Sequence, residues 1–353
     1  MICLLTLFPI TAGAAPLDET LDTAALSDAL PAEAAPFLGD VSPLDGSAGN
    51  VFGRIWEAAA EKASGCMATA LRTAVVLLIV CVLVALSETI VPGEKGPGTA
   101  ALAGVAAIGA SALSDFDSYL NLGLDSLQTM SDYSKALLPT LASAAAISGG
   151  AGGAAAKYAA TALFMDILLE AARRFAAPGI CAMAALSIAE AAVGNHTLKA
   201  AKKLLKTVCG LMLTGLAMAF TGYLAVSGVV AETADAMTAR MAKTAVSSAL
   251  PVVGSILSDA AGTLAAAAGV LRGSVGLFGM AAVLCVCIGP FAVLGTRYLA
   301  FRLAAGLCGC VADKRFTTLM EDLGTCFGMI LALNGVGALM MFLSIYALIR
   351  TAV

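Results

Sequence analysis

Charged residues are scarce in this chain, and their scarcity decides its broad class. Aspartate, glutamate, lysine and arginine make up 12% of the 353 residues, whereas they make up roughly 25% of a soluble domain. Hydrophobic residues account for 60%, and mean hydropathy is +0.93. The alternating pattern of an outer-membrane strand is absent. The sequence therefore predicts an all-α polytopic membrane protein with about six to eight transmembrane or re-entrant helices and additional amphipathic interfacial helices.

Histidine is almost missing as well, which bears on catalysis. His196 is the only one, and it lies in a lysine-rich stretch where a solvated position is expected. A Ser/His/Asp set needs a buried histidine, and no glycine-rich segment carries the GxxxxGK[ST] pattern of a phosphate-binding loop. These absences argue against an enzyme. We expect no catalytic residue, no cofactor and no nucleic-acid partner.

The ten cysteines include no CxxC motif. Cys285 and Cys287 form one close pair, and Cys308 and Cys310 form another, which raises the alternative of metal or redox chemistry. A structural zinc site needs a set of Cys and His ligands, and a single histidine supplies it poorly. Most of the cysteines lie inside apolar runs, so we interpret them as small residues of the membrane core and expect no metal.

The N-terminal region differs in composition from the rest of the chain. Residues 1–15 form a short apolar run that ends on small residues, which is typical of a signal peptide, but the run has no basic start. Residues 16–65 carry seven acidic residues before the first basic one, and we predict an acidic extracytoplasmic arm there. Around Trp56, residues 51–66 predict an amphipathic helix at the membrane interface. Residues 66–353 are predicted to form the polytopic membrane domain.

Four runs are long and apolar enough to be interpreted as membrane spans. They are Thr73–Ile90, Thr207–Val230, Ser274–Thr296 and Leu323–Ile349. Residues 99–113 are short and rich in Ala and Gly, so a span there needs partner helices. Residues 114–135 predict an amphipathic helix with aspartates on one side. Charged residues interrupt Tyr158–Val193 and Pro178 lies within it, so we predict a hairpin or re-entrant arrangement for this region.

Basic residues indicate the orientation in the membrane. The Asn195–Lys206 loop carries four lysines, and Arg297, Arg302, Lys314 and Arg315 follow another predicted span. Short loops rich in Lys and Arg mark the cytoplasmic side. We therefore place both basic regions inside, and the acidic arm and the C-terminus outside.

The stretch Lys243–Gly279 is neither a polar loop nor a clean membrane span. Ser255, Asp259 and Thr263 recur every fourth residue, which on a helix makes one narrow polar stripe on an apolar cylinder. Asp259 has no cationic residue nearby in sequence. Two alternatives stay open: a helix that lies flat at the interface and exposes Asp259 to water, or a stripe that lines a conduit or contacts a partner.

Other ionisable residues inside apolar runs are functional candidates, because a charge is costly in a bilayer. We expect Glu190 to lie at a helix end among the lipid headgroups. Asp166 and Glu170 stand at helical spacing from Arg173 and Arg174, so we predict structural ion pairs among these four.

Several short segments follow one another in a recognisable order. They are Lys135–Leu141 with Pro139, the Pro178 segment leading to Leu186-Ser-Ile, the LKAAKKLLK stretch, Arg240-x-x-Lys243, Pro251-Val-Val-Gly254 with Ser258-Asp259, and Arg272-Gly-Ser-Val-Gly276. Together they resemble the stage III sporulation protein AE family of endospore-forming bacteria over roughly residues 114–350. The part from Pro251 to Gly276 is the specific one.

The resemblance implies a role. Members of the family are the large polytopic subunit of a multi-protein complex that joins mother cell and forespore across the two engulfment membranes. That complex is regarded as a channel or feeding apparatus needed for forespore development, and it partly resembles specialised secretion systems. The resemblance implies a multi-pass location in the mother-cell membrane around the forespore and an oligomeric assembly in the lipid bilayer. It also implies partners, namely other membrane subunits of the same sporulation operon and a forespore-side partner.

A second hypothesis is an independent permease for a small solute. Helices broken around Pro139, Pro178 and Pro251 are typical of transporters, but the chain shows no convincing internal repeat. Small-residue packing explains the glycines equally well. A membrane-embedded enzyme is a third class, against which the missing catalytic groups argue.

Overall fold

The computed structural model describes residues 28–38, 48–90, 99–114, 116–147, 151–194, 196–249, 253–310 and 313–350, and every regular element within them is helical. Six stretches are long and apolar enough to cross a membrane. They are Gly53–Ser87, Thr99–Ser143, Ala154–Val193, Thr197–Val226, Gly273–Cys308 and Lys314–Ile349. The predicted all-α polytopic class is confirmed, and the number of spans lies at the lower end of the predicted range.

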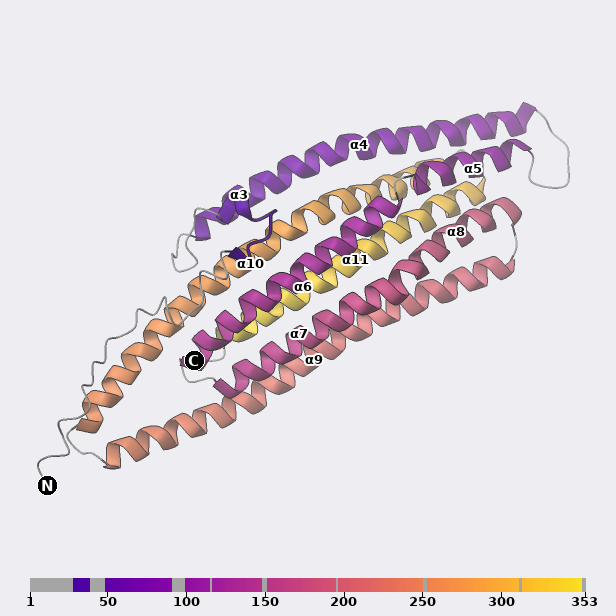
Figure 1. Cartoon of the computed structure of the whole chain (residues 1–353). Helices are drawn as coiled ribbons and strands as arrows, with labels where there is room; N and C mark the ends of the chain where they lie inside the picture. The colour runs from indigo at the N-terminus through magenta and orange to yellow at the C-terminus, as the bar shows by residue number, and fades with distance from the viewer. Residues whose placement is uncertain are drawn as a thin grey trace, which may run out of the picture.

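The helices follow one another along the chain as six traverses of an elongated bundle (Figure 1). In order they are α3 (Ala35–Leu38), α4 (Ala48–Ile90), α5 (Thr99–Leu113), α6 (Phe116–Ile147), α7 (Ala151–Ala171), η1 (Ala172–Ala176), α8 (Ala177–Val193), α9 (His196–Ala249), α10 (Val253–Cys308) and α11 (Lys314–Arg350). The short α5 and the start of α6 share one traverse. The predicted boundary between arm and membrane domain, at residues 65 and 66, lies inside the continuous helix α4.

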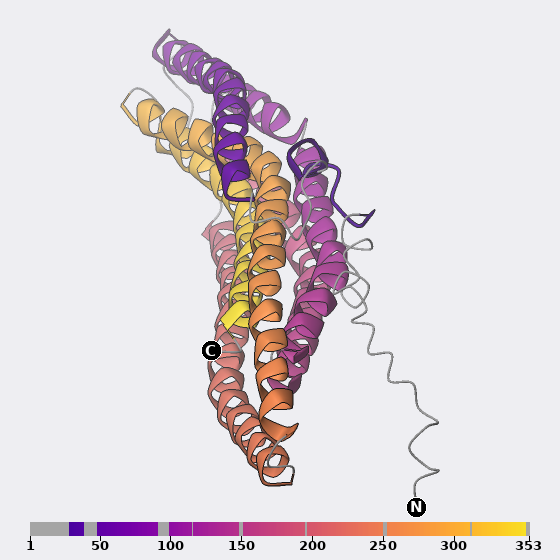
Figure 2. The ribbon, with the colours of Figure 1, turned by 90° about the vertical axis from the view of Figure 1, so that its left-hand side faces the viewer.

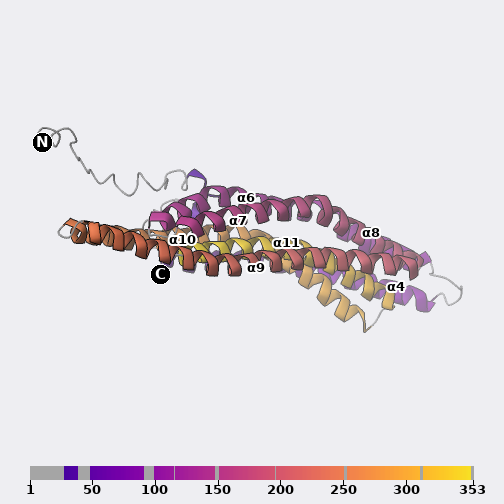
Figure 3. The same cartoon turned by 90° about the horizontal axis from the view of Figure 1, so that it is seen from below.

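Helix α11 occupies the centre of the bundle. It contacts α6, α7, α8, α9 and α10, and Figure 2 shows it between α6 on one side and α9 on the other. Helix α4 packs mainly on α10, and Figures 2 and 3 place α4 and α6 on opposite sides of the bundle. The interior is therefore filled by a helix and its side chains, and α4, α6 and α9 each present an outer surface.

Small residues let the helices approach closely, as is common between membrane helices. A Cβ atom built on Gly279 of α10 would lie 2.5 Å from a methyl carbon of Leu137 on α6, so glycine is what makes room for this leucine. Gly276, one of the residues of the family resemblance, makes room for the side chain of Ile349 of α11 in the same way. These two contacts fix the depth at which α6 and α11 lie against α10.

The region Tyr158–Val193 is one continuous rod, so the predicted hairpin is wrong. α7, η1 and α8 follow without a break, and η1 is a π-helical turn directly before Pro178. Proline has no backbone N–H, and its ring collides with the carbonyl four residues earlier. A π turn inserts one extra residue, and the N–H of Ala177 here donates to the carbonyl of Ala172. The wider turn accommodates the proline, and the helix bends there without reversing.

Helices α9 and α10 continue together beyond the rest of the bundle (Figure 1). They contain 54 and 56 residues, or about 80 Å each at 1.5 Å per residue. Because Gly276 lies against Ile349 near the end of α11, the part of α10 before Gly276 extends past α11. We call the paired segments 227–249 and 253–272 the α9–α10 projection.

Basic residues gather at one end of the bundle. The turns between α8 and α9 and between α10 and α11 lie at one end, where Lys199, Lys203, Lys314 and Arg315 gather. The α9–α10 projection and the end of α11 lie at the other. The predicted basic loop Asn195–Lys206 is helical from His196 onward, so its lysines stand on the first turns of α9.

Candidate functional site

The residues singled out from the sequence fall into two groups. Ser255, Asp259 and Thr263 lie in the first turns of α10, on the α9–α10 projection, where the description covers the backbone alone. Of the family-motif residues, Lys243 lies on α9, Gly254 and Arg272 lie on α10, and Pro251 lies outside the described residues. The stripe therefore stays a prediction. Pro139 and Gly276 lie at one depth of the bundle, because Leu137 packs on Gly279.

The structure draws attention to a different polar stripe, on α6. Its members are exposed and recur at intervals of three, four or seven residues, which are one or two helical turns and place them on one side of the helix. We call them the α6 polar face: Asp117, Asn121, Asp125, Asp132 and Lys135. No large apolar side chain is exposed among the described side chains of α6, residues 116–143.

The opposite side of α6 explains why the polar face points outward. Leu127, Leu137 and Leu138 are fully buried, and α6 packs them against α10, α11 and α7. Leu127, for example, fills the space over Gly337 of α11. The apolar side takes the bundle contacts, so the side that carries the aspartates is left on the outside of the molecule.

Hydrogen bonds run along the α6 polar face. The amide of Asn121 donates to Asp117 at 3.3 Å. Gln128 donates to Asp132 at 2.8 Å, and Lys135 pairs with Asp132 at 3.4 Å. Each of these contacts joins residues one helical turn apart, which stabilises the helix by a few tenths of a kcal/mol per pair. Asp125 has no ion-pair partner among the described residues.

A second row of charges on α7 and η1 joins this face. Lys135 pairs with Asp166 at 3.8 Å, and Arg173 donates to the side-chain oxygen of Gln128 at 3.0 Å. Arg174 pairs with Glu170 on the same helix. The predicted pairing of Glu170 with an arginine is confirmed. Asp166 instead pairs with Lys135 of α6, because Arg173 and Arg174 stand about two helical turns further along the chain.

The charged row and an apolar surface lie at the same depth on different sides of the bundle. Phe164 on α7 packs edge-on against Phe220 on α9, with ring centroids 5.4 Å apart. Asp166 lies two residues beyond Phe164, and Met218 lies two residues before Phe220 on the antiparallel helix, so the two are level. Yet Met218 is 70% exposed on an apolar side of α9. The bundle is therefore two-sided where a bilayer would surround it.

Helix α9 carries that apolar surface, and α4 carries a second one nearer the basic end of the bundle. The exposed large apolar side chains on the second half of α4 are Leu71, Val75, Val76, Ile79, Val82, Leu83 and Leu86, and Trp56 and Met67 are exposed earlier on the same helix. Those on α9 include Leu204, Val208, Leu211, Met218 and Val226. Surfaces of this composition suit lipid tails. The α6 polar face does not.

A buried lysine forms a second polar site near the basic end of the bundle. Lys202 of α9 is 7% exposed and pairs with both Glu190 of α8 and Asp322 of α11. The ammonium group therefore ties three helices together. Glu190 lies four residues before the helix-ending Gly194, as a helix-end position requires, but it faces Lys202 rather than the headgroups.

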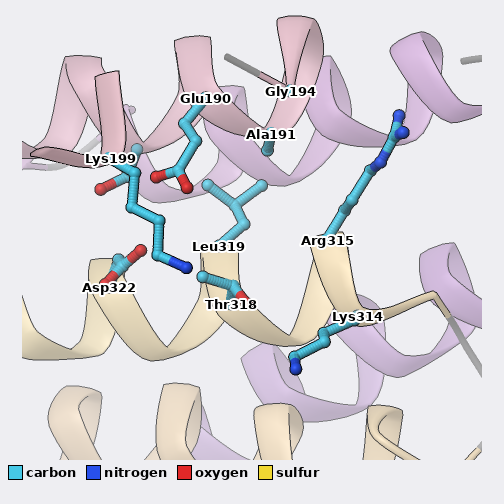
Figure 4. Close-up of a pocket in the computed structure, with 10 residues that line it drawn as sticks. Glu190, Ala191, Gly194, Lys199, Lys314, Arg315, Thr318, Leu319 and Asp322 are labelled. Carbon is cyan, nitrogen blue, oxygen red and sulfur yellow. The ribbon is translucent and has the colours of Figure 1, made fainter. Parts of the chain in front are cut away.

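A cavity of about 330 Å³ adjoins this lysine. Figure 4 shows Glu190, Lys199 and Asp322 pointing toward the same space from three helices. Lys314 and Arg315 also line it and point away from each other. The cavity opens at the basic end of the bundle, and both of its carboxylates already hold Lys202. We interpret Lys202 and its partners as a structural clamp.

Cysteine and metal chemistry find no arranged site in the described residues. The nine cysteines there are free thiols, most of them buried between helices. No cluster of three or more His, Cys, Asp or Glu side chains that could hold a metal ion occurs in the part of the chain described.

Known proteins are similar to this chain over most of its length. A sequence profile described as stage III sporulation protein AE matches residues 43–352. The stage III sporulation protein AE of Bacillus subtilis (strain 168) is 26% identical over 238 residues, which cover 67% of this chain and 60% of that protein. The alignment thus spans less than two thirds of the relative's length. No solved structure matches the chain. The profile begins well before residue 114, where the resemblance was expected to start.

Proposed function

The chain belongs to the stage III sporulation protein AE family, and from that premise we propose that it is a membrane subunit of a channel-like, secretion-like complex that links mother cell and forespore during sporulation. The role in spore formation follows from the family. The channel complex and its location are the proposal.

The two-sided outer surface of the bundle is the observation that supports it. Helix α9 offers lipid an apolar surface, whereas the α6 polar face is exposed at the same depth. Charged side chains within membrane spans almost always face the interior of a bundle or a water-filled space. A monomer surrounded by lipid would break that rule along α6. A subunit whose α6 side is turned toward an assembly would not.

The proposed location is the mother-cell membrane around the forespore, where the chain is a multi-pass protein. By the positive-inside rule the basic end of the bundle faces the mother-cell cytoplasm. The opposite end, with the α9–α10 projection, then faces the space between the two engulfment membranes. The proposed partners are other membrane subunits of the same operon and a forespore-side partner that the projection is long enough to approach.

Replacement of charges on the α6 polar face tests this proposal. Asp125→Leu and Asp132→Leu should lower the frequency of heat-resistant spores and the recovery of the chain with its complex partners, while the protein still accumulates in the membrane. Leu211→Ala, on the apolar side of α9, is the matched control and should sporulate normally. The proposal fails if a deletion of the gene leaves spore formation intact, or if the α6 variants behave as the control does.

An independent permease is less well supported by the arrangement of polar groups. A carrier that works alone needs its polar path inside the bundle, but α11 fills the interior, and all charged residues of α6 and α7 except the buried Lys157 lie outside among the described side chains. Saturable uptake of one solute by vesicles that hold only the purified chain, abolished by Asp259→Asn, would favour the permease instead.

A further inference from the structure

The length of the α6 polar face matches the thickness of a bilayer. Asp117 and Lys135 are 18 positions apart, which is about 27 Å along a helix at 1.5 Å per residue. The hydrocarbon core of a bilayer is about 30 Å thick. A polar face of this length is long enough to reach across most of the hydrocarbon core when the helix stands upright in the membrane.

Contacts with neighbouring helices place this face at membrane depth. Tyr119, two residues after Asp117, lies under the guanidinium of Arg297, which donates to Thr73 at 2.7 Å where the apolar run of α4 begins. At the other end, Lys135 pairs with Asp166, which is level with Met218 in the apolar run of α9. The Lys135 end of the α6 polar face therefore stands beside a lipid-facing segment of α9, and the Asp117 end is level with Thr73, from which the apolar run of α4 continues away from α6.

Neither lipid nor a dry protein contact suits this face. The charged side chains around Lys135 are half exposed or more, for example 58% for Asp132 and 60% for Asp166. Lipid tails would leave them without water. A dry interface would desolvate Asp117, which accepts only a hydrogen bond from Asn121, and Asp125, which pairs with no cation in the described part of the chain. Burial of unpaired carboxylates is strongly unfavourable. A dry contact would need a partner with matching basic side chains, whereas water solvates these carboxylates without one.

We propose that the α6 polar face lines a water-filled path across the membrane, and that copies of this chain close the path by turning their α6 sides inward. This inference deepens the proposed function and rests on it, because a conduit is what a channel subunit would supply. Repetition of one contact around a closed ring removes every α6 face from lipid at once. It leaves the apolar surfaces of α4 and α9 where lipid can reach them.

The charges of the face indicate what the path would favour. Asp117, Asp125 and Asp132 outnumber Lys135, so the lining carries a net negative charge. The excess of carboxylates lies in the part of α6 nearer the basic end of the bundle. Rings of carboxylates attract cations and repel anions. The path would therefore pass small cations and hydrated neutral solutes more readily than small anions.

Thiol labelling in sporulating cells tests the inference. The ten native cysteines are first replaced, and the cysteine-free chain must support sporulation. Single cysteines are then introduced in place of Asn121, Asp125 and Asp132, with Met218→Cys as the lipid-facing control and Leu127→Cys as the buried control. A membrane-impermeant cationic thiol reagent should label the three α6 positions at least ten-fold faster than either control. The corresponding anionic reagent should label Asn121→Cys more slowly than the cationic one.

Crosslinking tests whether copies of this chain face one another through α6. A bifunctional thiol reagent with a long spacer should join two copies through Asp125→Cys but not through Met218→Cys. Protection of all three α6 positions would overturn the inference, as would crosslinks from Asp125→Cys to other proteins only. Both results leave the proposed function standing if the α6 leucine variants still fail to sporulate. If labelling and crosslinking give the expected results but the α6 leucine variants sporulate normally, the proposed function is contradicted and the water-filled path is not.

Discussion

Lys202 on α9 and Asp322 on α11 form an ion pair between residues 120 positions apart in sequence, and Glu190 on α8 completes the group. A buried pair of this kind adds little stability by itself, because removal of both charges from water offsets their attraction. Loss of one partner is different, since it leaves an uncompensated charge. The contact therefore makes the packing of three helices depend on one ammonium group.

Replacement of Lys202 should destabilise the protein strongly. Lys202→Met leaves the largely buried carboxylates of Glu190 and Asp322 with like charges and without the ammonium group that pairs with both, which we expect to cost about 3–5 kcal/mol in the free energy of unfolding. Thermal unfolding of the purified protein in detergent measures the loss. Lys203→Met, at the exposed neighbouring position, should change stability by less than about 0.5 kcal/mol. The triple variant with Glu190→Gln and Asp322→Asn should recover most of the loss, and a triple variant as unstable as Lys202→Met would refute the clamp.

The contact between Gly279 and Leu137 gives a prediction about packing. Gly279→Val places methyl groups where Leu137 lies, and overpacking of this kind costs about 1–3 kcal/mol. Gly215 of α9 has nothing within 4 Å of an added Cβ, so Gly215→Val should be neutral within a few tenths of a kcal/mol. Melting temperatures in one detergent compare the two variants. Equal melting temperatures would show that α6 and α10 are not held together at this point.

Composition predicted the fold class, but it did not predict the two long helices or the continuous α7–η1–α8 rod. Alanine has the highest helix propensity, and the Ala-rich segments of Lys243–Gly279 continue the helices of their neighbouring spans. Pro178 predicts a break, because a proline usually ends or kinks a helix. The π turn that accommodates it depends on backbone geometry, which the residue types in the sequence do not predict.

The polar sites were visible in part. The spacing of the aspartates predicted an amphipathic helix over 114–135, but that pattern alone leaves its polar side free to face water, a cavity or a partner. The position of α6 against α10 and α11 decides that it faces outward. Lys202 was missed because it stands in a row of lysines. It shares a helix side with Cys209 and Phe220, both buried, and that spacing was a usable signal.

A lysine placed on either outer side of the bundle should distinguish lipid from water. Met218→Lys puts a charge among apolar side chains of α9, which costs about 2.5–3.5 kcal/mol near the centre of a span. Asn121→Lys puts the same charge on the α6 polar face beside Asp117 and Asp125, where it should be tolerated. The amount of folded protein in the membrane, measured by size-exclusion profiles after extraction, should fall for Met218→Lys alone. Equal losses would contradict a two-sided bundle.

The predicted stripe on α10 can be tested by the same labelling chemistry. Because α10 before Gly276 extends past the end of α11, Ser255, Asp259 and Thr263 lie beyond the packed bundle. A hydrated stripe on a helix that packs elsewhere should label every third or fourth residue. Single cysteines across residues 247–263 of the cysteine-free chain should therefore react fast at these three positions and slowly at Leu257 and Ala261, which lie on the opposite side.

Two other labelling patterns would contradict the stripe, each for its own reason. Uniformly fast labelling would mean that water surrounds this part of α10 on all sides. Uniform protection would mean that lipid or protein covers it completely, which a carboxylate without a cationic neighbour in sequence makes costly. Asp259→Asn separates a contact from a solvated position: loss of spore formation with a normal membrane level indicates that a partner or conduit uses the carboxylate, whereas normal spore formation leaves it a solvated residue on the α9–α10 projection.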